Sequence, residues 1–525
     1  MSASTSTSGV DVVVIGAGNA GLTAAVRLAQ SGAATLLLEQ HNIPGGCATS
    51  FRRGRFEFEV ALHQLSGLGT ENHPFQIRQL LGELGVLDRL EFVYEPDLYR
   101  VTIADLVDVT LPADRTGVVG VLAALHPAER RAVERFLDLV HDVFEEWIAF
   151  TYLGGSQLGP DEAKKKYPLF THYALRTLRE VLDELFVSQT LKTVLAAYWD
   201  YLGQTPANWD YLGQTPANLA FVDYAVVFEV YLEYKPAHIK GGSQAMSNAL
   251  LDQFQRLGGE VRFSCGAGAI LTEDGHVKAV RTVGGDTISC RAVVSNVSTP
   301  VTYGRLLDTG TPAAVAQDLA SRPIGVSGCM VYLGLDATPH ELGMTTSTSF
   351  SFAGFDHDLL GPRRDEIGDP RAIAVTCYSL ADPSFSPPGT THLVIMDLQY
   401  SEPWTRLSPS EYLDVKFAYG NKLIDFAERT FPGLRDTIAE ADVATPITVM
   451  RYLRHPGGAI YGFDQTPSDS ALLRSGGVVV PGLYLAGAWT GTGGFQPTLT
   501  AGAAAADAVL AAIGRNHLSP PGAPR

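Results

Sequence analysis

The feature that most constrains the fold is a strand, a glycine-rich turn, a helix and a second strand between residues 10 and 39. Residues 10–15 (VDVVVI) form an apolar run with the length and valine content of a buried strand. The string GAGNAGLTAAVRLAQSG follows and predicts a helix over residues 22–30, which Gly32 ends. A second apolar strand over residues 34–38 ends at Glu39. This order predicts a parallel βαβ unit at the start of an α/β fold.

Three glycines in this unit have the spacing of a dinucleotide-binding site. Gly16 permits the tight turn, Gly18 lets a pyrophosphate approach the backbone, and Gly21 lets the helix pack closely on the strand. The start of the helix supplies unpaired N–H groups and the positive end of its dipole, and Glu39 is placed to accept hydrogen bonds from a ribose. This pattern alone leaves NAD and FAD as alternatives. The residues assigned to the site are Gly16, Gly18, Asn19, Ala20, Gly21, Glu39 and Gln40.

The composition excludes several kinds of partner. Of the 525 residues, 46% are hydrophobic and 18% are charged, which is typical of a globular protein with a large core. The net charge of −17 argues against a nucleic-acid partner and against electrostatic docking on anionic lipid, because phosphate groups repel a negative surface. The basic run at residues 164–166 is typical of a solvated helix face.

The sequence also bears on location. The five cysteines form no CxxC pair, which predicts a reducing compartment and no metal or disulfide framework. The first residues, MSASTSTSG, have neither the basic region nor the apolar core of a signal peptide, and no segment reaches the roughly 20 apolar residues that span a bilayer. We expect a cytoplasmic protein that is soluble or peripheral to a membrane.

The segment after Glu39 narrows the choice of cofactor. Residues 40–67 read QHNIPGGCATSFRRGRFEFEVALHQLSG, with the glycine pair Gly45 and Gly46. This stretch resembles the FAD site of the flavoprotein group that contains phytoene desaturases, carotenoid isomerases and retinol saturases. The sequence departs from the group at Cys47, where relatives carry arginine or serine, and at residues 58–61, where FEVA replaces Phe-Asp-x-Gly. The resemblance implies bound FAD, with Gly45, Gly46 and Cys47 beside it.

Two later segments are similar to the same group. Residues 239–296 contain a glycine pair, a helix, the string GGEVRF and the string VVSN, and the resemblance implies that Val261 contacts the adenine and that Ser295 ends a strand near the cofactor. Residues 482–513 contain a strand, a glycine-rich loop and a helix expected over residues 500–513. Relatives carry aspartate at position 488, so Ala488 leaves the ribityl contact to the backbone or to Thr490. The flavin contacts implied here are Gly487, Ala488, Trp489, Gln496, Pro497 and Thr498.

The predicted fold is a two-dinucleotide-binding, Rossmann-type FAD domain interleaved with a helical and α+β substrate domain. Residues 1–9 and 515–525 are expected to be tails, residues 10–104, 236–299 and 446–514 to form the FAD domain, and residues 105–235 and 300–445 to form the substrate domain. Within the latter we expect a helix over residues 132–148 and strands over residues 328–335 and 392–400. The decapeptide WDYLGQTPAN at residues 199–208 is repeated at residues 209–218 and predicts an added turn and short helix.

Three side chains are candidates for catalysis. Tyr461 lies in the string HPGGAIYG, which is similar to a motif beside the flavin ring in the isomerase and saturase relatives, with His455 behind it. The alternative is a glycine-rich hairpin with a packed tyrosine. His63 lies in a segment expected near the flavin, and its alternative is a structural histidine.

The resemblance predicts an FAD-dependent oxidoreductase that acts on C–C bonds of a long hydrophobic polyene or isoprenoid, with phytoene desaturase-like dehydrogenation as the first hypothesis. Cis–trans isomerisation and retinol saturase-like reduction are the main alternatives. Two further alternative functions are an amine oxidase and a non-redox protein that binds prenyl lipids. The expected partner is a hydrophobic small molecule, transient contact with a membrane is compatible with it, and the oligomeric state stays open.

Overall fold

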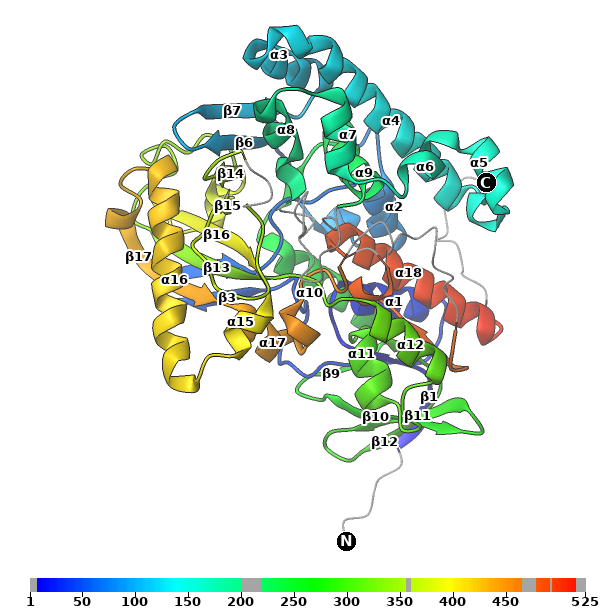
Figure 1. Ribbon diagram of the computed structural model, residues 1–525. Helices are drawn as coiled ribbons and strands as arrows, with labels where there is room; N and C mark the ends of the chain where they lie inside the picture. Colours follow the sequence, from blue (N-terminus) through cyan, green and yellow to red (C-terminus); the bar gives the residue numbers. More distant parts are fainter. Residues whose placement is uncertain (1–6, 200–218, 356–359, 465–477, 492, 516–525) are drawn as a thin grey trace.

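Two seven-stranded sheets form the framework of the protein in the computed structural model, which describes residues 7–199, 219–355, 360–464, 478–491 and 493–515. One sheet lies beside the helices α1 (Asn19–Gln30) and α18 (Phe495–Ala512), and the other lies next to the helical insertion (Figure 1). Both sheets draw strands from segments far apart in the chain. This architecture confirms the predicted α/β fold with interleaved parts.

The first sheet is built around β1 (Thr7–Ile15). Its neighbours are β2 (Thr35–Leu38) on one side and β12 (Thr287–Ser295) on the other, and both run parallel to it. The remaining strands are β9 (Glu260–Arg262), parallel to β2, β18 (Leu483–Leu485), parallel to β12, and the antiparallel β10 (Ala267–Glu273) and β11 (His276–Thr282). The predicted βαβ unit is therefore confirmed, and β18 joins it from the far end of the chain.

Close helix packing covers one face of this sheet. Helices α1, α18 and α10 (Gly242–Arg256) share a core with the inward residues of β1 and β12. Gly502 of α18 meets α1 where a Cβ atom would lie 2.8 Å from the Cα of Ala20, so only glycine allows the two helices this contact. The helix α18 begins at Phe495, earlier than the predicted residue 500, because Pro497 is tolerated in a first helical turn.

The second sheet has β13 (Ser327–Leu335) and β16 (Thr391–Gln399) near its centre, paired antiparallel along nine residues each. Both strands confirm the predictions for residues 328–335 and 392–400. Its other strands are β17 (Ile438–Ala444), β15 (Ala372–Cys377), β14 (Thr348–Phe352), β6 (Asp97–Ile103) and β7 (Val107–Pro112). Since β6 pairs with β14, residues 97–103 belong to this sheet and not to the first, which differs from the boundary expected at residue 104.

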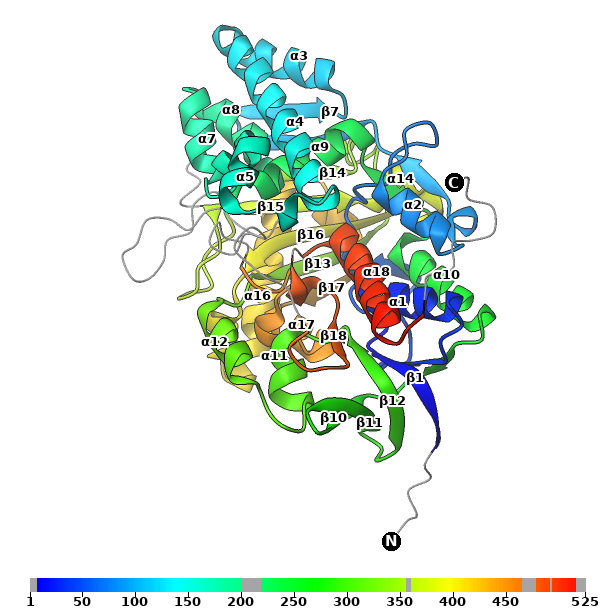
Figure 2. The same cartoon turned by 90° about the vertical axis from the view of Figure 1, so that its right-hand side faces the viewer.

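The two faces of the second sheet have different cover. The helix α16 (Pro409–Thr430) packs on one face through Leu423 and Ala427, and the helical insertion packs on the other (Figure 2). In the insertion, α4 (Arg130–Tyr152) confirms the helix predicted at residues 132–148 and buries Phe136 and Phe144. The other helices of the layer are α3 (Arg115–Leu125), α5 (Pro160–Lys166), α6 (Pro168–Tyr173), α7 (Leu178–Leu185), α8 (Gln189–Ala196) and α9 (Phe221–Tyr234).

Three remaining predictions concern local features. The lysines at residues 164–166 are exposed on α5, as expected for a solvated face. The repeated decapeptide falls almost wholly on residues 200–218, outside the described residues. None of the described helices combines the length and the apolar composition needed to cross a membrane.

Candidate functional site

The predicted cofactor segments meet at one edge of the first sheet. The strands β1, β2, β12 and β18 are parallel, so their carboxyl ends lie together. The chain leaves β1 toward β2 through α1, whereas β12 lies on the opposite side of β1, which makes this edge a topological switch point. Gly18 of the β1–α1 turn pairs with Gly45, and Gly46 lies against Gly18. Ligands of open α/β sheets bind at such a point.

Bare backbone lines this edge. A Cβ atom on Gly21 would lie 3.0 Å from the carbonyl carbon of Gly16 and closer still to its oxygen, so the turn requires glycine there. Gly487, after β18, has a φ of +98°, and a Cβ atom on it would lie 2.5 Å from the Asn296 side-chain oxygen. Asn296 also approaches Gly18 and donates a long hydrogen bond of 3.5 Å to the Gly16 carbonyl oxygen. The four glycines Gly16, Gly18, Gly21 and Gly487 form a cradle of bare backbone that has no room for side chains.

The start of α1 favours an anion in this cradle. Gly18 is the N-cap residue, and the first turn carries no acidic side chain. Four N–H groups at a helix start lack helical partners and, with the dipole, attract phosphate. The Asn19 side-chain oxygen is buried and has no hydrogen-bond partner among the described residues, so as an acceptor it suits a hydroxyl or N–H group of a ligand. Ala20 packs against Gly487. This end of the site therefore suits a phosphate-bearing ligand.

Glu39 closes the far side of the cradle. Its buried carboxylate accepts hydrogen bonds from the backbone N–H groups of Ala17 (2.6 Å) and His41 (2.8 Å). Gln40 follows it as an exposed residue, and Val261 pairs with Leu37 on the adjacent strand. Burial raises the pKa of the Cys47 thiol to about 11, so this position offers a neutral group and no cation. The phosphate must then be held by backbone.

The third segment approaches the first near α18. Gln496, in the first turn of α18, accepts a hydrogen bond of 3.1 Å from the Ser66 hydroxyl. Trp489 is buried, and its indole N–H has no partner among the described residues. Thr490 donates to the Gly487 carbonyl oxygen at 2.8 Å, next to Ala488. Pro497 and Thr498 follow Gln496 in the helix, and Ser295 turns away, since its hydroxyl lies 2.8 Å from that of Thr302.

Tyr461 and His455 pack against the loop that precedes α18. The backbone of Tyr461 packs directly against Gly493, where a Cβ atom would lie 2.6 Å from the tyrosine Cα. The same tyrosine interacts electrostatically with Tyr231 of α9. His455 donates from Nδ1 to the Ala459 carbonyl oxygen at 2.9 Å and packs edge-on against Trp489. Burial lowers the pKa of His455, so its ring closes a turn in the neutral form.

His63 points from the first segment toward the second sheet. Its Nδ1 lies 3.0 Å from the Tyr378 hydroxyl and 3.2 Å from the Thr376 hydroxyl. Burial lowers its pKa to about 4, so the ring is neutral near neutral pH. The structure thus brings Tyr461 to α18 and Tyr231, and His63 to β15 and α14 (Tyr378–Ala381).

Sequence reasoning missed a set of buried polar side chains around the first segment. Gln64 donates to the Glu95 carboxylate (2.7 Å), and its backbone oxygen accepts from the Tyr231 hydroxyl (3.1 Å). Burial raises the pKa of Glu95 to about 7. Glu59, at the position of the usual aspartate, accepts from the N–H and hydroxyl of Ser243 at the start of α10 (2.7 and 2.6 Å). The sequence held one signal for these buried polar residues. At residues 58–61, FEVA replaces the family pattern Phe-Asp-x-Gly and places a carboxylate, Glu59, in an apolar strand.

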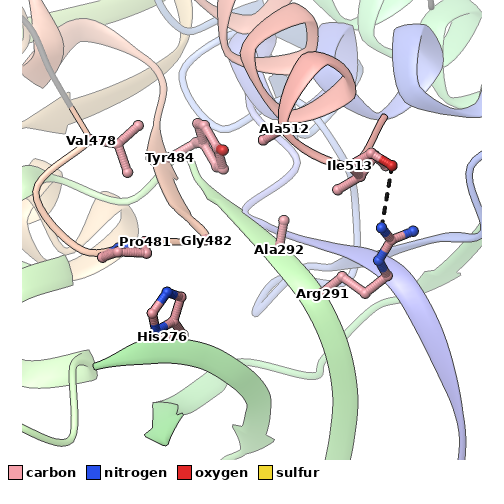
Figure 3. Close-up of a pocket in the computed structure, with 9 residues that line it drawn as sticks. All are labelled: His276, Arg291, Ala292, Val478, Pro481, Gly482, Tyr484, Ala512 and Ile513. Atoms are coloured by element: carbon pink, nitrogen blue, oxygen red, sulfur yellow. Dashed lines mark hydrogen bonds between the residues drawn. The ribbon is translucent and has the colours of Figure 1, made fainter. Parts of the chain in front are cut away.

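A separate hollow of about 470 Å³ lies beside the middle of β12 and next to β18 (Figure 3). Its lining includes His276, Arg291 and Tyr484, and Arg291 donates to the Ile513 carbonyl oxygen at 3.2 Å. Arg291 is the middle residue of β12, whereas the cradle lies beyond Ser295 at the end of the strand. The hollow is therefore distinct from the cofactor edge.

Comparison with known proteins identifies the family. Residues 19–510 match the family described as flavin containing amine oxidoreductase. The chain belongs to this family. A cyclohexylamine oxidase from Brevibacterium oxydans has the same fold, with a TM-score of 0.60 and 16% identity over 97% of this chain and 100% of that one. The family confirms FAD as the cofactor and the protein as an FAD-dependent oxidoreductase.

Three relatives have names that lie outside amine chemistry. An all-trans-retinol 13,14-reductase from Danio rerio is 26% identical over 94% of this chain and 84% of its own length. A chloroplastic prolycopene isomerase from Daucus carota is 24% identical, with 91% and 76% covered, and a lycopene-forming phytoene desaturase from Pseudescherichia vulneris is 23% identical, with 95% and 98% covered. The resemblance to the desaturase, isomerase and saturase group is therefore confirmed.

The cradle fits FAD. Gly16, Gly18 and the start of α1 would hold the pyrophosphate, Glu39 would hold the ribose, and the backbone around Gly487 would hold the ribityl end, as the closely packed glycine backbone and the helix start indicate. The buried unpaired Asn19 oxygen would accept from a hydroxyl or N–H group of the cofactor. Bound FAD supplies two-electron oxidation and reduction.

Proposed function

We propose that this protein catalyses hydrogen transfer at a C–C bond of a long apolar polyene or isoprenoid, with dehydrogenation as in the phytoene desaturase as the first candidate. One observation carries the proposal: relatives named as a reductase, an isomerase and a desaturase each align with more than nine-tenths of the chain. The amine oxidase structures are below 25% identity and support the fold alone.

The side chains next to the flavin segments suit an apolar substrate. Phe51 and Phe58 pack against Tyr332 of β13, with ring centroids 5.0 and 6.1 Å apart. Tyr198 and Tyr231 stack at 4.8 Å on the side of the helical insertion. Aromatic walls bind apolar chains through area and dispersion, and a C–C bond offers no charge for a specific counter-ion. Phe58, Tyr198 and Tyr332 are buried in one core cluster, so they keep water away from the flavin segments.

Two residues are proposed to act on the substrate directly. Tyr461 is packed through its backbone and Cβ atom on Gly493, which fixes its Cα near the start of α18. His63 is held at Nδ1 by the Tyr378 and Thr376 hydroxyls, so its ring orientation is set from outside the site. We propose that Tyr461 orients the substrate and that His63 exchanges a proton with it. Reduction is the second candidate, favoured by the Danio rerio relative.

The test is product analysis under anaerobic conditions. The holoenzyme is incubated with phytoene, prolycopene, retinol and putrescine, once with oxidised and once with chemically reduced FAD, and the products are analysed by mass spectrometry. Loss of two hydrogens from a polyene with oxidised FAD supports dehydrogenation. Gain of two hydrogens with reduced FAD supports reduction, and unchanged mass with altered geometry supports isomerisation. Oxidation of putrescine alone would overturn the proposal, and protein stripped of FAD is the control.

A further inference from the structure

Three histidines surround one tyrosine behind the segment of residues 61–67. The Tyr378 ring stacks on His392 of β16 with centroids 4.6 Å apart, and the ring of His238 in β8 (Ala237–Ile239) lies 5.9 Å from it. His63 approaches the Tyr378 hydroxyl at 3.0 Å. His238, His392 and Tyr378 are at most 1% exposed. We call these four residues the imidazole cluster.

Several nitrogen atoms of the imidazole cluster need partners. Both ring nitrogens of His392 and Nε2 of His238 are buried, and no hydrogen-bond partner for them exists among the described residues. The nearest rings to His392 besides Tyr378 are Phe58 and Phe385, at 5.1 and 5.3 Å, which neither donate nor accept such bonds. Native proteins pair nearly all buried polar atoms, and ordered water commonly supplies the missing partner. Three such nitrogens in one place indicate a small group of water molecules.

The imidazole cluster lies next to Asp382, a buried carboxylate with exposed neighbours. Burial opposes ionisation of this carboxyl, but hydrogen bonds from Ser384 and Gly241 outweigh it and lower its pKa. Asp382 interacts electrostatically with His238, while its neighbours Ser384 and Lys240 are exposed. The other nearby carboxylate, Glu59, already accepts bonds from Ser243 and from the turn at residues 61–62. Asp382 accepts from the hydroxyl of the exposed Ser384, whereas the Glu59 partner Ser243 is buried, so Asp382 is the carboxylate with a link to solvent.

The other end of the imidazole cluster is the flavin-facing segment. His63 stands three residues before Ser66, whose hydroxyl bonds to Gln496 at the start of α18. Burial lowers the pKa of His63 and His238 to about 4 and that of His392 to about 3, so all three rings are neutral. A neutral imidazole accepts a proton on one nitrogen and releases one from the other, and a tyrosine hydroxyl does the same through its oxygen.

We propose that His238, His392 and Tyr378 enclose ordered water that conducts protons between His63 in the flavin-facing segment and Asp382, which is buried and joined to solvent through its hydrogen bond from the exposed Ser384. The inference rests on the proposed function in one respect, because hydrogen transfer at a C–C bond demands a proton path. When two hydrogens leave, one departs with its electron pair to FAD, and the other departs as a proton whose C–H electrons form the new π bond. That proton passes through His63 to solvent, and reduction runs the same path in reverse. His238, His392 and Tyr378 are positioning residues.

A substrate-free experiment tests the path. The holoenzyme is reduced in a stopped-flow instrument by reduced methyl viologen, which delivers electrons without protons, in weakly buffered solution with a pH-indicator dye. Flavin bleaching and proton uptake are followed together in the wild type and in His392→Phe and Tyr378→Phe. We expect both signals to coincide in the wild type and proton uptake to lag at least tenfold behind bleaching in the two variants. Proton uptake that keeps pace with bleaching in both variants would overturn the proposal.

A matched control separates the path from general damage. Tyr419 is a buried tyrosine on the opposite face of the same sheet, where its hydroxyl bonds to Asp397, so Tyr419→Phe removes an equivalent group outside the path. We expect its proton uptake to coincide with bleaching. Tyr378→Phe loses one oxygen atom only, so it keeps the test decisive if His392→Phe fails to fold. Because no polyene is added, the result stands whether or not the proposed function fails.

Discussion

Replacement of Gly21 by alanine tests the cofactor cradle at its tightest point. A Cβ atom at this position would lie 3.0 Å from the carbonyl carbon of Gly16 and too close to its oxygen for any non-bonded contact. The clash is with backbone, so either the Gly16 carbonyl or the start of α1 must shift, and both belong to the proposed pyrophosphate cradle. Inserting a methyl group into a packed site costs about 1–3 kcal/mol. If this cost falls on the bound state, the Kd for FAD rises about 5- to 150-fold.

The assay is titration of the apoprotein with FAD, followed by flavin fluorescence. Gly120→Ala is the matched control, because Gly120 lies in α3 and nothing stands within 4 Å of the position that the new methyl group would take. Alanine is favoured over glycine inside a helix, so we expect this control to raise the free energy of unfolding by about 0.5–1 kcal/mol and to leave the Kd unchanged. A Gly21→Ala protein that binds FAD within twofold of wild type would refute the cradle.

Three further predictions concern single side chains. Glu39→Gln removes the charge that accepts bonds from Ala17 and His41, and we expect the Kd for FAD to rise about tenfold, in the range of a charged hydrogen bond; an unchanged Kd in the same titration would contradict the assignment. Burial raises the pKa of Glu95 from 4.5 to about 7, so between these pH values the folded state keeps a proton that the unfolded chain releases. The stability that Glu95 contributes is therefore fully present below pH 4.5 and is lost as the pH rises through 7. Between pH 4.5 and 8 the free energy of unfolding, measured with urea, should fall by about 3 kcal/mol less in Glu95→Gln than in the wild type. An equal fall in both proteins would count against the prediction. Tyr461→Ala should keep FAD and lower turnover at least tenfold in steady-state assays, whereas full activity would remove Tyr461 from the substrate site.

The local parts of the fold were predictable from the sequence. The βαβ unit and its glycines form a continuous pattern, and β13 and β16 are continuous apolar runs, so periodicity and turn residues suffice. The pairing of β6 with β14 was not predictable, because about 250 residues separate them and no local signal sets which strands become neighbours. The early start of α18 was hidden by the glycines at residues 491–494 and by Pro497.

The candidate site also has a part that was predictable from the sequence and a part that was not. The glycine cradle and Glu39 follow from spacing along one segment. The imidazole cluster joins residues 63, 238, 378 and 392 from four separate elements, and each histidine alone has the features of an ordinary core residue. Only the packing of the second sheet against the first segment brings them together. Single-sequence reasoning therefore identifies the cofactor before it can identify the side chains that serve the substrate.

The measurement that tests the central claim most directly is an anaerobic absorbance titration of the FAD holoenzyme with phytoene, prolycopene and putrescine in turn. The account predicts that a polyene bleaches the oxidised flavin band with a stoichiometry of one substrate molecule per flavin, while putrescine leaves the band unchanged. Bleaching by putrescine with no response to any polyene, under either oxidised or pre-reduced conditions, would contradict it and assign the protein to amine oxidation.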